Sequence, residues 1–264
     1  MQQLIAKNIF RFWELAAEST HGDIINKNEY LLAATKIPEP LFNMIIHSET
    51  HQTHVVEVEN MVSYFKERQL PFCWWVEHCG KNLPLIAHLQ TQNTLLDYKI
   101  HPFGDVCGMS ADIKALNLDY TLSSEVTLEW VYTKEQLNQW QEPLAKSFGL
   151  QPQNMTLYVD CCEKMYQKNP KSIRHLMAKQ GDKAVSSLTL FLDEQNQVAS
   201  LYSGGTTPEA RNQGIMTALG RKALSHALAE GYEQVVLQAA PDLQPLCLKS
   251  GLTIANRYAV YLFV

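Results

Sequence analysis

The sequence has no excess of basic residues, and its formal net charge is −5 over 264 residues. Proteins that bind nucleic acids need a basic surface to displace counterions, so this balance disfavours a nucleic-acid partner. It is compatible with a cationic amine as substrate. Hydrophobic residues make up 46% of the chain and charged residues 19%, which is ordinary for a globular protein and argues against extensive disorder.

Long apolar runs are also missing. No stretch approaches the roughly 20 apolar residues that span a bilayer. Residues 1–18 mix charges into an amphipathic pattern, whereas a signal peptide has an apolar core. We therefore expect no membrane partner and a cytoplasmic location.

The cysteines lack the spacing of a disulfide scaffold or of a C-x-x-C site. We expect reduced, mostly buried thiols at all six positions: Cys73, Cys79, Cys107, Cys161, Cys162 and Cys247. His47, His51 and His54 recur at a spacing that on a helix could present three imidazoles to zinc. No carboxylate or cysteine completes that set, so a solvated loop or helix face is favoured and no metal is expected. The signature elements of zinc proteases, serine hydrolases and P-loop proteins are absent too.

What the chain does contain is a turn with the features of an anion site. Residues 198–206 form a β-compatible run, Pro208 ends it, and apolar residues from Ile215 onward recur at helical spacing until Gly231. A turn that opens a helix offers unpaired N–H groups and the positive end of the helix dipole to a phosphate. Gly214 lets a ligand approach the backbone closely. The pattern predicts a phosphate cradle, although similar turns also occur in α/β proteins that bind nothing there.

Periodicity predicts the other elements. A first helix contains Ile5, Ile9 and Phe12. Further helices are expected at 57–68, 83–90, 134–147 and 156–167, and strands at 71–76, 108–113, 126–132, 183–191, 197–203, 234–239 and 258–264. The turn at 193–196 should join two of these strands as a hairpin.

The order of features around the cradle resembles the GNAT superfamily of acyl-CoA-dependent N-acyltransferases. The stretch Arg211-Asn212-Gln213-Gly214-Ile215-Met216 matches that family's coenzyme A signature, Q/R-x-x-G-x-G/A, except that Met216 stands where Gly or Ala is usual and narrows the loop. The stretches Leu237-Gln238-Ala239-Ala240-Pro241 and Pro245-Leu246-Cys247-Leu248-Lys249-Ser250-Gly251-Leu252 look like the family's ending. The resemblance covers roughly residues 125–264.

The resemblance implies an α/β fold of tandem GNAT-like domains, each a mixed, mostly antiparallel sheet flanked by helices. A chain of 264 residues has room for two cores. We expect a degenerate GNAT-like domain at 1–122 and a GNAT acetyltransferase domain that binds acyl-CoA at 123–264, divided in the polar segment 117–124. The first half has no Arg or Gln followed three residues later by Gly in a strand–turn–helix setting. It should therefore bind no coenzyme A, and it should wall the acceptor pocket.

The resemblance also implies how the coenzyme is held. In the family, a backbone N–H of the strand before the cradle polarises the thioester carbonyl, and the pantetheine arm takes the place of a strand between two splayed parallel strands. The implied contacts are Gly204, Gly205, Thr206, Arg211, Asn212, Gln213, Gly214, Ile215, Met216 and Thr217. Gly204 is equally compatible with a plain β-bulge.

The proton donor to the coenzyme thiolate is where the chain departs most from the family. Cys247 stands where a tyrosine is usual. A thiol with an ordinary pKa near 8.5 can donate a proton, but an inert packed thiol is an equal alternative. Tyr258 and Tyr202 are alternative donors. Asp242 is the candidate general base, with Glu209 or a chain of water molecules as alternatives.

The function that follows is acyl-CoA-dependent N-acyltransfer. We expect acetyl transfer from acetyl-CoA to a small amine or a protein amino group, directly within a ternary complex. The alternative is an acyl-CoA-binding GNAT-like module with little or no transferase activity, and a weaker one is a purely structural protein. Two halves that pair within one chain are compatible with a monomer.

Overall fold

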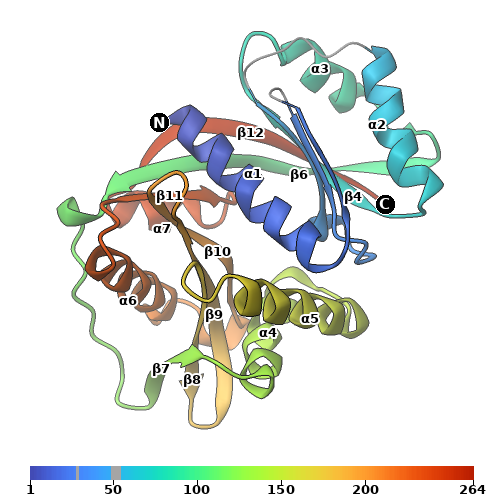
Figure 1. Cartoon of the computed structure of the whole chain (residues 1–264). Coiled ribbons are helices and arrows are strands. Elements are labelled where there is room, and N and C mark those ends of the chain that lie inside the picture. The colour runs from blue at the N-terminus through green and yellow to red at the C-terminus, as the bar shows by residue number, and fades with distance from the viewer. Residues whose placement is uncertain (28–29, 49–54) are drawn as a thin grey trace. The chain divides into compact units, whose positions relative to one another are not determined.

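The computed structural model describes residues 1–27, 30–48 and 55–264 (Figure 1). Its contacts divide the chain into two compact units. Unit 1 comprises residues 1–108, 239–244 and 254–264, and unit 2 comprises residues 109–238 and 245–253. This division differs from the expected one at 122/123, chiefly because the end of the chain belongs to unit 1.

Unit 1 is built on a mixed sheet with the strand order β1-β2-β3-β4-β12-β6. Its neighbours β1–β2, β2–β3 and β4–β12 are antiparallel, and β3–β4 is parallel. The strands are β1 (Asp23–Asn26), β2 (Tyr30–Ala34), β3 (Asn43–His47), β4 (Phe72–Glu77), β12 (Thr253–Phe263) and β6 (Tyr98–Asp112), and the short β5 (Thr94–Leu95) pairs with β6. Strand β6 is far longer than the predicted strand 108–113.

Helices give unit 1 its apolar core. Side chains of α2 (Val55–Glu67) and α3 (Leu83–Thr91) form one buried cluster with the strands, in which Phe72 stacks on Phe65 and Phe263 at ring-centroid distances of 4.4 and 4.3 Å. Helix α1 (Gln2–Ser19) packs against β1 and β2, and its Ile5, Ile9 and Phe12 are fully buried as the periodicity predicted. The short helix η1 spans Pro40–Phe42.

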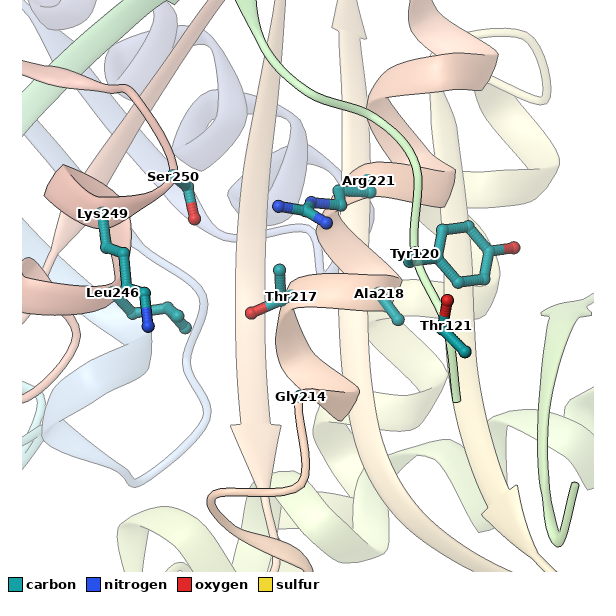
Figure 2. Close-up of a pocket in the computed structure, with 9 residues that line it drawn as sticks. All are labelled: Tyr120, Thr121, Gly214, Thr217, Ala218, Arg221, Leu246, Lys249 and Ser250. Atoms are coloured by element: carbon teal, nitrogen blue, oxygen red, sulfur yellow. The ribbon is translucent and has the colours of Figure 1, made fainter. Parts of the chain in front are cut away.

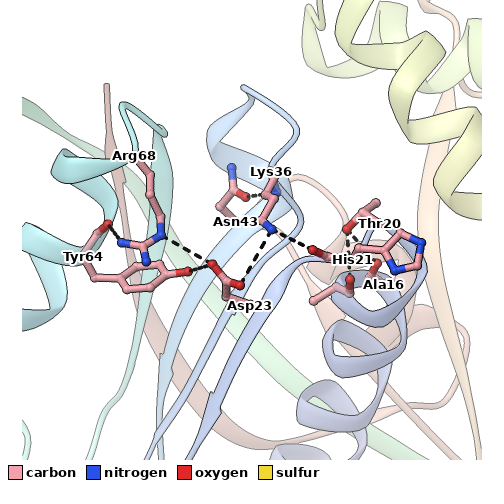
Figure 3. Close-up of polar contacts among 9 residues, drawn as sticks. Ala16, Thr20, His21, Asp23, Lys36, Asn43, Tyr64 and Arg68 are labelled. Atoms are coloured by element: carbon pink, nitrogen blue, oxygen red, sulfur yellow. Dashed lines mark hydrogen bonds and ion pairs between the residues drawn. The ribbon is translucent and has the colours of Figure 1, made fainter.

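A polar cluster ties α2 to the first strands of unit 1 (Figure 3). The Asp23 carboxylate accepts a hydrogen bond from Tyr64 Oη at 2.6 Å and lies 3.7 Å from Lys36 Nζ and 3.4 Å from Arg68 Nε. The Tyr64 hydrogen bond, assisted by the two cations, lowers the pKa of Asp23. Lys36 also donates to the backbone carbonyl of His21 at 2.7 Å. Exposed pairs of this kind each contribute little, but here they link elements distant in sequence.

The last strand, β12, is the main reason why the two compact units differ from the expected domains. It pairs antiparallel with β4 in a register from Tyr258↔Glu77 to Phe263↔Phe72. Phe263 is 0% exposed within the core of unit 1. Which strand an apolar run will pair with is decided by packing rather than by local sequence, so the run at 258–264 was predicted as a strand without its partner.

Unit 2 contains a mostly antiparallel sheet with the order β11-β10-β9-β8-β7 and the end of β6, residues 109–112, beside β11. Only β10–β11 is parallel among the pairings of these five strands. The strands are β7 (Val126–Val131), β8 (Ile173–Gln180), β9 (Lys183–Asp193), β10 (Val198–Thr206) and β11 (Gln234–Ala239). β9 and β10 form the predicted hairpin.

Helices flank the sheet of unit 2 on both sides. Figure 1 shows α4 (Lys134–Phe148) and α5 (Pro152–Lys168) on one side of β8–β10 and α6 (Ile215–Ala229) on the other. Thr133 and Gln136 form a capping box that starts α4, and Gly149 ends it at φ +66°. The remaining helices are η2 (Ile113–Ala115), η3 (Pro208–Ala210) and α7 (Gln244–Lys249). None of the helices in the described ranges combines the length and apolar composition that a membrane crossing requires.

Candidate active site

The two parallel strands of unit 2 part before they end. β10 and β11 pair at Ala199↔Val235, Ser200↔Val236 and Leu201↔Leu237, and no further. Residues 202–206 of β10 and 238–239 of β11 therefore continue outside the paired register. An extended ligand can add its own hydrogen bonds to backbone exposed in this way.

A β-bulge lies in the same part of β10. The register between β9 and β10 shifts between Tyr202 and Gly205, so Ser203 and Gly204 have no partner residue in that ladder. Ser203 has φ +49°, a left-handed conformation that is uncommon for a residue with a side chain. The bulge that the sequence offered as one interpretation of Gly204 is present, and it leaves backbone groups available beside the splay.

The cradle loop follows directly. Arg211, Asn212, Gln213 and Gly214 are exposed, and Gly214 stands before α6 at φ +75° and ψ 2°. Gly214 has no side chain to cap the helix, and the N-terminus of α6 has no side-chain cap, so the N–H groups of its first turn are available to a ligand. A Cβ built on Gly214 would meet no atom within 4 Å, so the space in front of the helix is open. These features are those of an anion site at a helix N-terminus.

The side chains of the loop hold its shape. Arg211 Nε donates to the Thr206 carbonyl at 3.2 Å, and Gln213 Nε2 donates to the Glu209 carbonyl at 3.2 Å. Glu209 also forms an ion pair with Lys183 at 3.2 Å. Hydrogen bonding to its own backbone N–H and to Lys183 lowers the pKa of Glu209. An exposed carboxylate held in this way fits a turn residue better than a general base.

A pocket of about 280 Å³ opens beside the cradle (Figure 2). Its lining includes Gly214, Thr217, Ala218 and Arg221, which share one face of α6 at helical spacing. The other lining residues are Tyr120, Thr121, Leu246, Lys249 and Ser250. Figure 2 shows Thr217 and Arg221 on the side of α6 that faces the end of α7. The lining carries two cations and no carboxylate, so it favours an anionic ligand.

Sequence reasoning missed several members of this pocket. Arg221 lies seven residues after Gly214, and that interval, two turns along one helix face, was the signal available for it. Its Nη1 donates to the backbone carbonyl of Asp119, which ties it to the segment that supplies Tyr120. Lys249 gave no such signal, because it belongs to another helix.

The three predicted coenzyme contacts at the end of β10, Gly204, Gly205 and Thr206, have different surroundings. A Cβ on Gly204 would lie 3.6 Å from Met216 Cε and 3.7 Å from its sulfur, so the side chain of Met216 covers the bulge. A Cβ on Gly205 would lie 2.9 Å from Leu144 Cα, which shows that close packing against α4 requires glycine there. Thr206 Oγ1 hydrogen-bonds Ser186 Oγ at 2.8 Å. Met216 thus narrows the approach to the bulge.

The three predicted catalytic residues are distributed over both units. Cys247 is 6% exposed on α7 in unit 2, and it is its neighbours Leu246, Lys249 and Ser250 that line the pocket. Asp242 is exposed in the turn after β11, among the residues of unit 1.

Tyr258 lies on β12 in unit 1 and is 0% exposed. Its Oη accepts a hydrogen bond from Asn256 Nδ2 at 3.0 Å, and burial raises its pKa. A phenol enclosed in this way is poorly placed to reach a ligand. All six cysteines, each within the described ranges, carry thiols, and all but Cys79 are buried as predicted.

Unit 1 contains a second pair of parallel strands joined through a helix, but these strands do not splay. Strands β3 and β4 are also parallel and also joined through one helix, α2, but their pairing continues to His47↔Val76 at the last residue of β3. Trp74 Nε1 donates to His47 Nδ1 at 2.9 Å, and Tyr30 stacks on the His47 ring. No gap for an added strand remains along the described part of this pair.

The histidine pattern considered for zinc does not form one helix face. His47 ends strand β3, while His51 and His54 lie outside the described residues. Within the ranges that the structure describes, no group of three or more His, Cys, Asp or Glu side chains could hold a metal ion.

The cradle and the splayed strands fall inside a match to a known family. The family model described as Acetyltransferase (GNAT) family matches residues 134–247. Residues 134–247 form a GNAT acetyltransferase domain. The match runs from the start of α4 to Cys247, so the prediction of a GNAT acetyltransferase domain is confirmed over these residues, and acetyl-CoA is the co-substrate of that family. A comparison with curated proteins finds no match.

Solved structures extend the likeness to the rest of the chain. A GCN5-related N-acetyltransferase from Kribbella flavida superposes with a TM-score of 0.65 at 10% identity over 96% of this chain and 94% of its own. A GCN5-related N-acetyltransferase from Sphaerobacter thermophilus gives a TM-score of 0.60 at 13% identity over 91% and 75%. A tandem GNAT protein from the clavulanic acid biosynthesis pathway gives 0.57 at 9% identity over 89% and 78%. At these identities the likeness shows the fold, and the predicted tandem GNAT fold is confirmed.

Proposed function

We propose that this chain is an N-acetyltransferase that moves the acetyl group of acetyl-CoA directly to an amine, with the coenzyme held by unit 2. One observation supports this most strongly. The pairing of β10 with β11 ends at Leu201↔Leu237, and Met216 in the first turn of the open, glycine-started helix α6 reaches back to the unpaired part of β10, where its Cε lies 3.6 Å from a Cβ built on Gly204. A thioester arm and a pyrophosphate need these two kinds of site, a strand-shaped gap and an anion cradle, next to each other.

The proposed roles in coenzyme binding follow from the positions of residues in unit 2. The N–H groups of residues 214–217 would bind the pyrophosphate, with Arg211 supplying charge. The backbone of residues 204–206 would bind the arm, and an N–H at the bulge would polarise the thioester carbonyl. The amine must arrive neutral, attack that carbonyl and expel the thiolate, which takes up a proton. We assign the proton donor to Cys247 and the deprotonation of the amine to Asp242 or water.

The test of the coenzyme site uses Gly214→Glu in the full chain. Acetyl-CoA at a hundred times its Kd should stabilise the wild-type fold by about 2.7 kcal/mol and raise its melting temperature by several degrees. The variant should lose this shift because the glutamate fills the open space before α6 and repels phosphate. Calorimetric melting with and without acetyl-CoA measures both.

A matched control is Gly231→Glu. Gly231 follows the other end of α6, has φ +92°, and has nothing within 4 Å of a built Cβ, so the change adds similar strain and the same charge. This control should keep the acetyl-CoA shift. Equal shifts in the wild type and in Gly214→Glu would place the phosphate site elsewhere. Thiol release from acetyl-CoA over a panel of amines then tests transfer. If acetyl-CoA binds but no amine increases thiol release, the alternative of a coenzyme-binding module without transferase activity is favoured.

A further inference from the structure

A buried pair of hydroxyl groups supports the bulge of β10 from the side of α5. Tyr158 Oη and Ser203 Oγ lie 2.7 Å apart, a short hydrogen bond. Tyr158 is 3% exposed, and its ring stacks with that of Trp140 at a centroid distance of 6.3 Å. The phenol is therefore held by packing, and it in turn holds Ser203.

Ser203 is also the strained residue of the bulge. A non-glycine residue at φ +49° is strained, and this conformation persists only where its surroundings fix it. Glycine would adopt this conformation without strain, and glycine follows directly at Gly204 and Gly205. A serine here is informative because its hydroxyl supplies the contact that stabilises the conformation.

We propose that Tyr158 is a positioning residue of the transferase: its hydrogen bond holds Ser203 in the left-handed conformation, and this fixes the bulge whose backbone N–H polarises the acetyl carbonyl. The inference rests on the proposed function. It assigns Tyr158 no contact with substrate and no proton transfer. Its effect is carried through the backbone of Ser203 and Gly204.

The groups beside Tyr158 are consistent with a neutral, permanent hydrogen bond. Burial raises the pKa of Tyr158 itself, and burial raises that of Cys162 as well. Burial raises the pKa of Cys161 to about 12 and lowers that of His175 to about 4. None of these groups changes charge near neutral pH, so a positioning role predicts a loss that is the same across the neutral range. An acid–base role would give a loss that varies with pH.

The variants separate the hydroxyl from the conformation that it holds. Tyr158→Phe should lower kcat about tenfold or more, because a misplaced carbonyl donor loses much of its effect, and should leave the Kd of acetyl-CoA within about twofold. Ser203→Ala should lower kcat by as much, since alanine at φ +49° is strained and its side chain forms no hydrogen bond to Tyr158. Ser203→Gly should be clearly more active than Ser203→Ala. Adding Tyr158→Phe to Ser203→Gly should cost nothing more, and Tyr166→Phe on α5 is the control for a phenol outside this pair.

A spectroscopic measurement tests the same point without knowledge of the acceptor amine. The infrared stretch of acetyl-CoA labelled at its acetyl carbonyl should fall on binding to the wild type, and should return toward its solution value in Tyr158→Phe and Ser203→Ala. Thermal melting of each variant accompanies it, because a purely structural role would shift the melting temperature and leave the carbonyl frequency unchanged.

Three results would overturn the inference: equal carbonyl frequencies in all variants, a Ser203→Gly protein as impaired as Ser203→Ala, or a further loss from Tyr158→Phe in the glycine background. If the wild type binds no acetyl-CoA, the proposed function fails, and this inference fails with it. If acetyl-CoA binds but its carbonyl frequency in the variants equals that in the wild type, this inference alone is overturned.

Discussion

At the scale of single residues, Cys247 carries the sharpest question about chemistry. It is 6% exposed on α7, between residues that line the pocket, and the GNAT family usually has a tyrosine at its position. A thiol is shorter than a phenol, so protonation of the coenzyme thiolate requires the sulfur of the coenzyme to come close to α7.

Cys247→Ala should lower kcat on the order of a hundredfold with the affinity for acetyl-CoA nearly intact, because a general acid acts in the transition state. Cys247→Tyr should restore part of the rate if the pocket accommodates a ring. Cys73→Ala is a matched control, since Cys73 is a fully buried thiol in unit 1. An unchanged kcat in Cys247→Ala at saturating acetyl-CoA would show a packing thiol, with only a stability cost.

At the scale of elements, α6 contributes to the proposed site along two turns. Its N-terminus forms the proposed anion cradle, and Thr217, Ala218 and Arg221 continue the same face into the pocket, where Lys249 of α7 adds a second cation. The apolar residues of the opposite face anchor the helix on the sheet: Ile215, Leu219, Ala223 and Ala227 are each at most 1% exposed. Through its periodicity, one helix therefore presents a buried apolar face to the sheet and an open face suited to an anion to the pocket.

Removing either cation of the pocket should weaken coenzyme binding. Arg221→Gln and Lys249→Gln should each raise the Kd of acetyl-CoA about tenfold, because a charge-assisted hydrogen bond to phosphate is worth roughly 1.5–3 kcal/mol. The dependence of Kd on salt should become shallower in both. Lys164 is an exposed cation on α5, and Lys164→Gln should change neither the Kd of acetyl-CoA nor its dependence on salt. Titration calorimetry at two salt concentrations measures this, and an Arg221→Gln protein with wild-type affinity would exclude the pocket from binding.

At the scale of the whole molecule, the chain contains the same strand–helix–strand crossover twice, and the two copies differ in how far their strands are paired. Both β3–α2–β4 and β10–α6–β11 are parallel strand–helix–strand crossovers. The first is paired to the end of β3 and held by the Trp74–His47 hydrogen bond, and the second opens after Leu201. The tandem fold therefore presents one strand-shaped gap in the parallel pairs that the structure describes.

This asymmetry predicts one acetyl-CoA per chain. Titration calorimetry on the full chain should give a stoichiometry near one, since among the residues that the structure describes unit 2 alone has both the splay and the cradle. Gly214→Glu should abolish all of the binding heat. A stoichiometry near two, or residual binding in that variant, would contradict the expectation that residues 1–122 form a degenerate copy.

Sequence periodicity located most elements of unit 2 but few of the early strands. The helices α4 and α5 and the strand β11 match their predicted ranges within a few residues, because their apolar spacing is long and regular. Strands β1, β2 and β3 were not predicted, and neither was β8. β1 to β3 are only four or five residues long, too short for a clear period, and β8 is buried at consecutive positions rather than in alternation.

The sequence by itself determined the match to the GNAT family in the second half of the chain, the turn at Arg211 to Thr217 that is proposed as the cradle, and the hairpin before it, since each depends on local backbone chemistry such as the φ of Gly214. Tertiary structure alone decided the rest of the site. The register that ends at Leu201↔Leu237, the contact between Tyr158 and Ser203 and the joining of Arg221 with Lys249 each bring together distant segments. The place of β12 in unit 1 is the same kind of choice. Such pairings are selected by burial and hydrogen bonding in the folded chain, and no local pattern specifies them.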